Sequence, residues 1–154
     1  MIIKNAQAGL MLKRVIVTDL LVNNQVAEAL VAFDENSQTL DMDYEIRKLD
    51  SSPETLNSEV KLKTKIVIKV EKQKRFELKV THLGLVSAPT SAFDTEEDFD
   101  KAVELNGLAS LISFARANIA SISGLTFCHG NIVLPMINVY KLNDLKRAKE
   151  KSKE

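Results

Sequence analysis

The sequence predicts one α+β domain in which a four-stranded antiparallel sheet is followed by a long helix and a short C-terminal helix. Four segments in its first half are rich in apolar residues, and most alternate apolar with charged residues, which is typical of strands with one buried and one solvated face. After Pro89 the period changes to the 3-4-3-4-3 spacing of a helical seam, formed by Leu105, Leu108, Ile112, Ala115, Ile119 and Ile122.

The strands are expected in the order of the alternating segments. Residues 10–22 (LMLKRVIVTDLLV) are rich in apolar and β-branched residues and form the first strand. Residues 38–49 and 59–71 follow, and the second of these places lysines between its apolar positions. These lysines are expected to make one sheet face soluble. Residues 23–37 fit a loop or a short helix, and the pattern does not decide between them.

The fourth strand begins near Phe76, after a connection of hairpin length with the sequence KQKR. Apolar residues alternate with polar ones up to Val80. At Gly84 the phase of the alternation shifts to Leu83 and Leu85, which predicts a bulge or the end of the strand.

Helix signals follow Pro89. Asp94 or Thr95 can cap a helix, and Glu97 or Asp98 three residues on would complete a capping box. The pair Asn106-Gly107 is expected to break or bend the helix. Gly124 is expected to end the long helix in a left-handed cap. An extended apolar segment, 132–137, comes next, and helical composition returns from Asn138 into a lysine-rich tail that is expected to be solvated.

The composition is that of a soluble globular protein. The 154 residues are 45% hydrophobic and 27% charged, so the chain can bury one core. Basic and acidic residues number 21 each, so no global charge attracts nucleic acid or an anionic membrane, and neither is expected as a partner. No apolar run approaches the length of a membrane span, and no secretory signal is recognised. With a single cysteine, Cys128, a cytoplasmic location is expected.

Catalytic and metal-binding patterns are weak. The two histidines are His82, inside a predicted strand, and His129, beside Cys128. A closed zinc site would need two further soft ligands, so the Cys128-His129 pair is interpreted as structural. The acidic cluster at 94–100 is interpreted as first-turn carboxylates favoured by the helix dipole. Neither a phosphate-binding glycine loop nor a nucleophile elbow is present. We therefore expect no enzyme activity, metal or cofactor.

The long helix is apolar on more than one side, and such a helix must be buried on more than one side. One sheet can cover only one of them, so a second subunit is expected to cover the other. The predicted oligomer interface consists of Leu111, Ile112, Phe114, Ala115 and Ile119.

The order and spacing of these elements resemble the SecB protein-export chaperones and their SecB-like relatives over residues 10–142. LMLKRVIVTDL is similar to the opening strand of that family, with its basic residue, Asp and apolar residue at Arg14, Asp19 and Leu20. FARANI resembles its aromatic-Ala-Arg-x-x-Ile helix core, which places Arg116. LPMINVYKL is similar to its Leu-x-Pro-x-Asn-Phe-x-x-Leu ending: Asn138 matches, whereas Val139 replaces the Phe.

This resemblance implies an ATP-independent holdase chaperone that assembles as a dimer of dimers and binds unfolded client polypeptides in apolar grooves. It implies a single chaperone domain over residues 1–143 and a charged tail over 144–154. The expected client-binding residues are apolar positions near the sheet and in the extended segment: Leu83, Leu85, Val86, Phe93, Met136, Ile137, Val139 and Tyr140.

Two departures from the family pattern argue against delivery of clients to the SecA motor. The strand at 59–71 carries lysines where typical export chaperones have an acidic face, and KRAKEKSKE replaces their short zinc-binding tail. Control of a toxin–antitoxin pair and a stand-alone holdase role therefore remain alternatives to protein export. The alternative from another class is a non-catalytic oligomeric adaptor that binds one folded partner. An exposed, continuous apolar groove would favour the chaperone, and a sealed surface would favour the adaptor.

Overall fold

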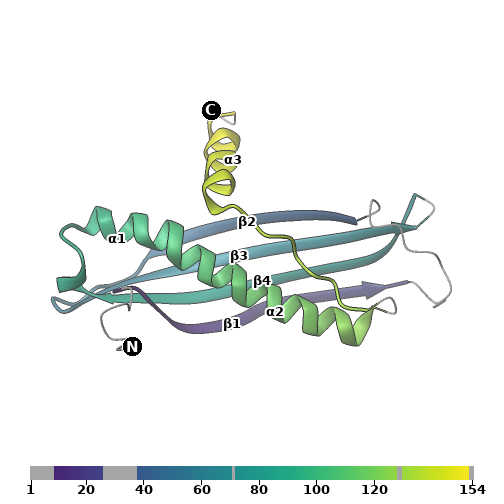
Figure 1. Ribbon diagram of the computed structural model, residues 1–154, viewed down its shortest axis with the longest axis horizontal. Coiled ribbons are helices and arrows are strands. Elements are labelled where there is room, and N and C mark those ends of the chain that lie inside the picture. The colour runs from purple at the N-terminus through teal and green to yellow at the C-terminus, as the bar shows by residue number, and fades with distance from the viewer. Residues whose placement is uncertain (1–8, 26–37, 71, 128–129, 153–154) are drawn as a thin grey trace, which may run out of the picture.

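The computed structural model describes residues 9–25, 38–70, 72–127 and 130–152. Four long strands form one antiparallel sheet in the order β1-β4-β3-β2; the long helix lies across one of its faces, and the C-terminal helix stands beside the β2 edge (Figure 1). The strands are β1 (Met11–Asn24), β2 (Gln38–Lys48), β3 (Thr55–Val70) and β4 (Gln73–Pro89). The helical elements are η3 (Thr90–Ala92), α1 (Glu96–Ala102), η4 (Val103–Gly107), α2 (Leu108–Thr126) and α3 (Val139–Lys151). The α+β architecture predicted from the sequence is confirmed.

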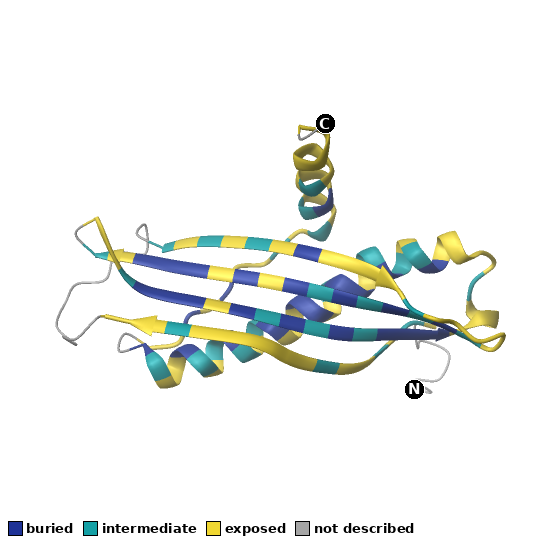
Figure 2. Ribbon diagram, turned by 180° about the vertical axis from the view of Figure 1, so that it is seen from behind, coloured by how far each residue is buried: buried dark blue, intermediate teal, exposed yellow. Residues whose placement is uncertain are grey.

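The alternation of residue types sorts the side chains onto the two faces of the sheet. Figure 2 shows buried and exposed residues in turn along the central strands. In β3, the apolar residues Val60, Leu62 and Ile66 are fully buried on the face covered by α2, which we call the helix face. The intervening lysines lie on the opposite, open face, where Lys63 faces Asp43 and Lys65 faces Asp41 in the register of β2 and β3. Opposite charges thus pair across the two strands.

Strand β4 is longer than the sequence pattern indicates. It neither ends nor bulges at Gly84, which pairs with both Val15 of β1 and Val60 of β3. The irregularities between β1 and β4 fall instead between Leu12 and Arg14 and between Val17 and Asp19. Glycine at position 84 has a packing reason, because a Cβ atom there would lie 3.0 Å from Leu12 Cδ1 and 3.2 Å from Leu111 Cδ1.

The helical half begins with Thr95 as the N-cap, one of the two caps expected, but the reciprocal bond of a capping box runs from the Thr95 hydroxyl and not from its backbone N–H. Thr95 accepts a hydrogen bond from the Asp98 backbone N–H (3.1 Å), and its hydroxyl donates to the Asp98 carboxylate (2.7 Å). The pair Asn106-Gly107 does not break the helix. It ends the π-helical turn η4, which joins α1 to α2 without interruption.

The resulting helical stretch, Glu96–Thr126, is long and apolar enough to cross a membrane by length and composition, contrary to the sequence-based expectation. In this fold its apolar seam packs on the sheet instead. Leu108, Ala115 and Ile119 are completely buried there. One core cluster surrounds α1, η4 and the first half of α2, and a second joins Ile119 to the far end of β3 and β4.

Helix α2 runs past Gly124 to Thr126, so the predicted left-handed cap at Gly124 is wrong. The helix ends in extended backbone at Phe127, whose N–H donates to the Ser123 carbonyl (2.7 Å). At position 124 a Cβ atom would lie 2.2 Å from Asn131 Oδ1, so the exposed Asn131 side chain would have to turn away. The undecided segment 23–37 is strand up to Asn24, and residues 26–37 lie outside the described part of the chain.

Candidate client-binding surface

The extended segment 130–138 returns along α2 on the helix face of the sheet (Figure 1). Its side chains alternate between the core and the surface: Ile132 and Leu134 are buried, whereas Val133 is 68% exposed and Met136 is 87% exposed. Ile132 and Leu134 pack with β3, β4 and Ile119 in the second core cluster. The buried side chains therefore anchor the segment to the core, while the apolar side chains between them are exposed to solvent.

Two polar side chains of α2 hold this backbone. Arg116 donates from Nε to the Leu134 carbonyl (3.2 Å) and from Nη2 to the Pro135 carbonyl (2.9 Å). Ser123 accepts a hydrogen bond from the Ile132 N–H (2.7 Å) and is itself buried. Because hydrogen bonds to a guanidinium are stronger than neutral ones, Arg116 fixes the segment beside the exposed Met136.

The predicted client-binding residues do not form one surface. Leu83 and Leu85 are half-buried on the open face, because in β4 they alternate with the helix-face residues His82, Gly84 and Val86. Val86 is completely buried in the core.

The other predicted client-binding residues lie on or beside the helical layer. Phe93 is half-buried with its ring centroid 5.6 Å from that of Phe99. Met136 and Tyr140 are exposed, whereas Ile137 and Val139 are partly buried against the core. Of the predicted client-binding residues, Met136 and Tyr140 are thus the two that are exposed on the helical layer.

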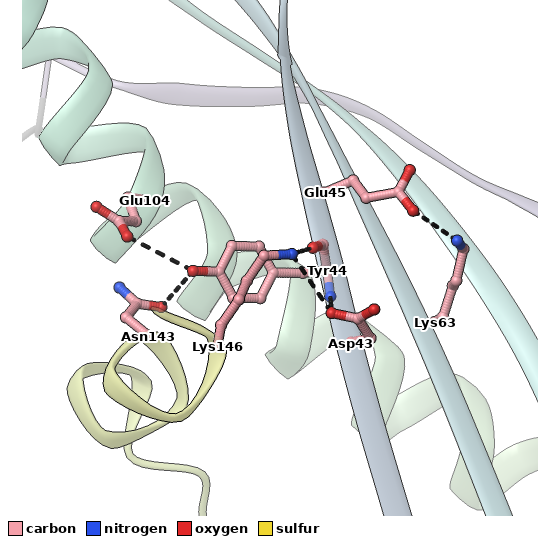
Figure 3. A network of polar contacts seen from close by, with 7 residues as sticks. All are labelled: Asp43, Tyr44, Glu45, Lys63, Glu104, Asn143 and Lys146. Atoms are coloured by element: carbon pink, nitrogen blue, oxygen red, sulfur yellow. Dashed lines mark hydrogen bonds and ion pairs between the residues drawn. The ribbon is translucent and has the colours of Figure 1, made fainter. Parts of the chain in front are cut away.

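Helix α3 is held against β2 and η4 by polar contacts (Figure 3). The hydroxyl of Tyr44 donates to Asn143 Oδ1 (2.9 Å) and lies 3.5 Å from the Glu104 carboxylate. Both Tyr44 and Asn143 are buried. Burial, reinforced by the negative charge of Glu104, raises the pKa of Tyr44 to about 12. The hydroxyl therefore remains a proton donor at neutral pH.

Two cations surround this buried pair. Lys146 lies over the Tyr44 ring, 4.3 Å from its centroid, and also contacts the Tyr44 carbonyl and Asp43 (3.4 Å). Arg147 Nη2 lies within hydrogen-bonding distance of both carboxylate oxygens of Glu104 (3.0 and 3.1 Å). We call Tyr44, Glu104, Asn143, Lys146 and Arg147 the α3 latch. The predicted boundary between domain and tail, at 143/144, falls inside α3, and Lys146 and Arg147 beyond it contact the sheet and η4.

The sequence did not single out the latch, because its parts are far apart in the chain and look like ordinary surface residues. An asparagine between apolar Leu142 and charged residues carries no local signal. Arg116 was singled out only as part of the FARANI motif, and its contact with the extended segment comes from the fold.

The predicted oligomer interface is largely used within the chain. Leu111, Ile112, Ala115 and Ile119 are buried by the protein's own sheet, so their side chains are not available to a second subunit. Phe114 is the exception: it is 43% exposed, and its ring meets that of His82 edge-on at 6.1 Å. The helix is apolar on more than one side because the sheet and the returning segment 130–138 both cover it.

A second exposed apolar surface follows the edge strand β1. Its consecutive residues Ile16 and Val17, and Leu20 and Leu21, are each 40–48% exposed. In the register with β4, Ile16 lies opposite Leu83 on the open face, and Val17 lies opposite His82 on the helix face. An edge strand with apolar residues on both faces is a site for pairing with another chain.

The described residues contain no group of three or more histidine, cysteine or acidic side chains that could hold a metal ion. His82 is completely buried, and its Nε2 lies 3.3 Å from the Asn118 amide nitrogen. Burial lowers the pKa of His82 below its ordinary value of 6.5, so the ring is neutral at pH 7. Cys128 and His129 lie outside the described residues.

Long antiparallel strands, a covering helix and an extended return to a short helix together define a SecB-like fold. The sequence matches no known protein family and no curated protein. Among solved structures, the chain is similar to a SecB-like chaperone of Mycobacterium tuberculosis in complex with a peptide from an antitoxin. The TM-score is 0.52 at 14% identity, with 84% of this chain and 91% of that one covered. A Streptococcus agalactiae protein of unknown function has a TM-score of 0.46 at 9% identity, covering 82% and 97%.

Proposed function

We propose that this protein is an ATP-independent holdase that binds extended apolar segments of unfolded polypeptides. The observation that carries the proposal is the row of exposed apolar residues Val133, Met136 and Tyr140 on a backbone fixed by Arg116. Burying such side chains under a client contributes about 25 cal/mol per Å² without directional requirements, so many client sequences can be accepted. The flexible thioether of Met136 suits varied partners.

The SecB-like fold supports this proposal, and the neighbour's antitoxin peptide illustrates the kind of client. We propose that this protein likewise works in the cytoplasm on non-native chains, as an export chaperone or as the guardian of an antitoxin. The neighbouring genes distinguish the two roles, because a toxin–antitoxin pair next to this gene would favour the role of antitoxin guardian. Delivery to SecA is not part of the proposal.

We further propose that the working unit is a homo-oligomer, with a tetramer as the family resemblance implies. In place of the helix seam predicted from the sequence, the β1 edge and Phe114 are the surfaces that a second copy would cover. They are adjacent, because Val17 faces His82 in the strand register and Phe114 packs on His82.

The test is suppression of the aggregation of a chemically denatured, slowly folding client without nucleotide. The wild-type protein should suppress aggregation at equimolar concentration, and salt should weaken the effect little because apolar burial is not screened. Met136→Ser combined with Tyr140→Ser should keep the fold and weaken client binding by on the order of 1–2 kcal/mol per side chain. Leu145→Ser, at another exposed apolar residue of α3, is the matched control and should bind as wild type.

Unchanged aggregation curves with the wild-type protein would show that it is not a holdase and would favour the alternative, an adaptor for one folded partner. A double variant that binds as tightly as wild type would place the client elsewhere on the molecule. One that unfolds would show that Met136 and Tyr140 stabilise the fold rather than bind clients.

A further inference from the structure

The net charge of zero conceals an uneven distribution of charged residues along the chain. Residues 65–79, which form the β3–β4 hairpin, carry six basic and two acidic residues. Residues 94–104, at α1 and η4, carry six acidic residues and one basic residue. The hairpin and α1 lie at opposite ends of the long axis of the molecule (Figure 1). Basic residues are therefore concentrated in the β3–β4 hairpin and acidic residues around α1, although the whole chain is neutral.

The hairpin end keeps most of its positive charge exposed. Three lysines converge on Glu77: Lys74 at 2.9 Å, Lys79 at 3.5 Å and Lys65 at 3.8 Å, and each lysine side chain is about half exposed. The hydrogen bond from Lys74 holds the pKa of Glu77 below its usual value, so this carboxylate stays charged. Glu77 and Asp41, which faces Lys65 in the strand register, leave the three lysines with an excess of positive charge.

The rest of the hairpin adds three further cations, Lys69, Lys72 and Arg75. They form no ion pair with other described residues, and Lys69 and Lys72 are exposed at the tip. Lys72 has a φ of 66°, the left-handed turn conformation that closes the hairpin. The turn thereby places the cations beyond the body of the sheet.

Exposed leucines accompany these cations. Leu125, near the end of α2, is 89% exposed. The chain fixes it close to the hairpin: Asn24 of β1 donates to the Thr126 carbonyl, and the next residue, Gln25, donates from its N–H to the Arg75 carbonyl (2.7 Å). Leu21, 44% exposed, faces Lys79 in the strand register. We call the six cations together with Leu21 and Leu125 the basic end.

We propose that the basic end docks on a membrane surface that carries anionic phospholipid headgroups. Lysine and arginine attract such headgroups, and exposed leucines enter the boundary between headgroups and acyl chains. Among the described residues of this end, the aromatic rings are Phe76 and Phe127, which are buried against each other at 4.9 Å and cannot stack on bases. A nucleic acid therefore fits this surface less well than a lipid headgroup layer. The balanced composition excluded only an attraction of the chain as a whole. This proposal is independent of the proposed holdase function.

The experiment is co-sedimentation of the full-length protein with vesicles of phosphatidylcholine alone and of phosphatidylcholine mixed with phosphatidylglycerol. Binding should require phosphatidylglycerol and should fall when salt rises from about 0.1 M to about 1 M, which shortens the Debye length from about 10 Å to about 3 Å. The test variant is Lys69→Gln with Lys72→Gln and Arg75→Gln. Each lost cation should weaken binding about fivefold, and all three together about a hundredfold.

The matched control is Lys101→Gln with Lys141→Gln and Lys151→Gln, which changes the net charge equally at exposed sites outside the hairpin. It should bind vesicles within about threefold of wild type, because charges beyond a Debye length are screened. A second variant, Leu125→Ser, should weaken binding even at high salt. Circular dichroism and thermal melting check that all variants fold.

Three results would overturn the proposal. One is a folded triple variant that binds as well as wild type. The second is a control that loses as much binding as the test variant, because a general charge effect would then explain both. The third is a wild-type protein that ignores the anionic vesicles but binds a short DNA duplex.

Discussion

The α3 latch gives the most direct test of how this fold holds its C-terminal helix. Tyr44→Phe removes the hydroxyl that donates to Asn143 and leaves a buried amide oxygen without its 2.9 Å partner. An unsatisfied buried acceptor costs about 1–3 kcal/mol. Because β2 keeps its ladder to β3, the loss should appear as detachment of α3 rather than as unfolding of the sheet.

Hydrogen exchange read by mass spectrometry measures this detachment directly. The amides of α3 should exchange about 5- to 150-fold faster in Tyr44→Phe than in wild type, whereas the amides of β3 and β4 should exchange at the wild-type rate. The control is Tyr140→Phe, which removes the same atom from the other tyrosine, whose side chain is largely exposed. It should leave exchange unchanged.

If the α3 amides of the Tyr44→Phe protein exchange at the wild-type rate, the latch does not hold α3 on the sheet. Equal acceleration in α3 and in the sheet would show that Tyr44 supports the whole core and not α3 in particular. The double variant Tyr44→Phe with Asn143→Leu, which removes both partners, should recover part of the loss because no buried polar group is left unpaired.

Two further predictions concern pH and assembly. Because burial lowers the folded-state pKa of His82, the unfolded state takes up a proton first as pH falls below 6.5. The free energy of unfolding should therefore decrease between about pH 7 and about pH 5. Urea titrations of His82→Leu should show a flatter dependence of this free energy on pH. A persistently steep slope in that variant would assign it to other groups. In light scattering, Phe114→Asp should dissociate the oligomer to folded monomers, whereas Leu145→Asp should not. A wild-type protein that is monomeric at micromolar concentration would contradict the assembly proposal.

Elements with one clear face could be predicted from the sequence. In most of β2 and β3 apolar residues alternate with charged ones, and the apolar residues are the less exposed of the two sets, so periodicity identified both strands. The N-cap at Thr95 was equally local, because its donor and acceptor lie three residues apart. Prediction failed in β4, where apolar residues lie on both faces. Leu83 and Leu85 lie on the open face, and the next residue, Val86, lies on the helix face. The alternation therefore seemed to stop at Gly84, although the strand continues.

Glycines show the same division. A sequence reveals that a position is glycine but not which neighbour requires it. Gly124 was interpreted as a left-handed helix end, yet the structure places Asn131 against it inside a continuing helix. The reason lies in the returning segment, which approaches α2 from residues later in the chain.

The sequence by itself thus determined the strand and helix content, their order and their resemblance to a SecB-like fold, because those features depend on contacts between near neighbours or on residue periodicity. Only the tertiary structure decided which apolar residues remain exposed, which side of α2 the sheet covers and where the charges gather. Tyr44 contacts Asn143 across 99 positions, and the basic residues of the β3–β4 hairpin lie far from the acidic residues of α1. Burial and electrostatic fields depend on distances in space, and long-range packing fixes those distances.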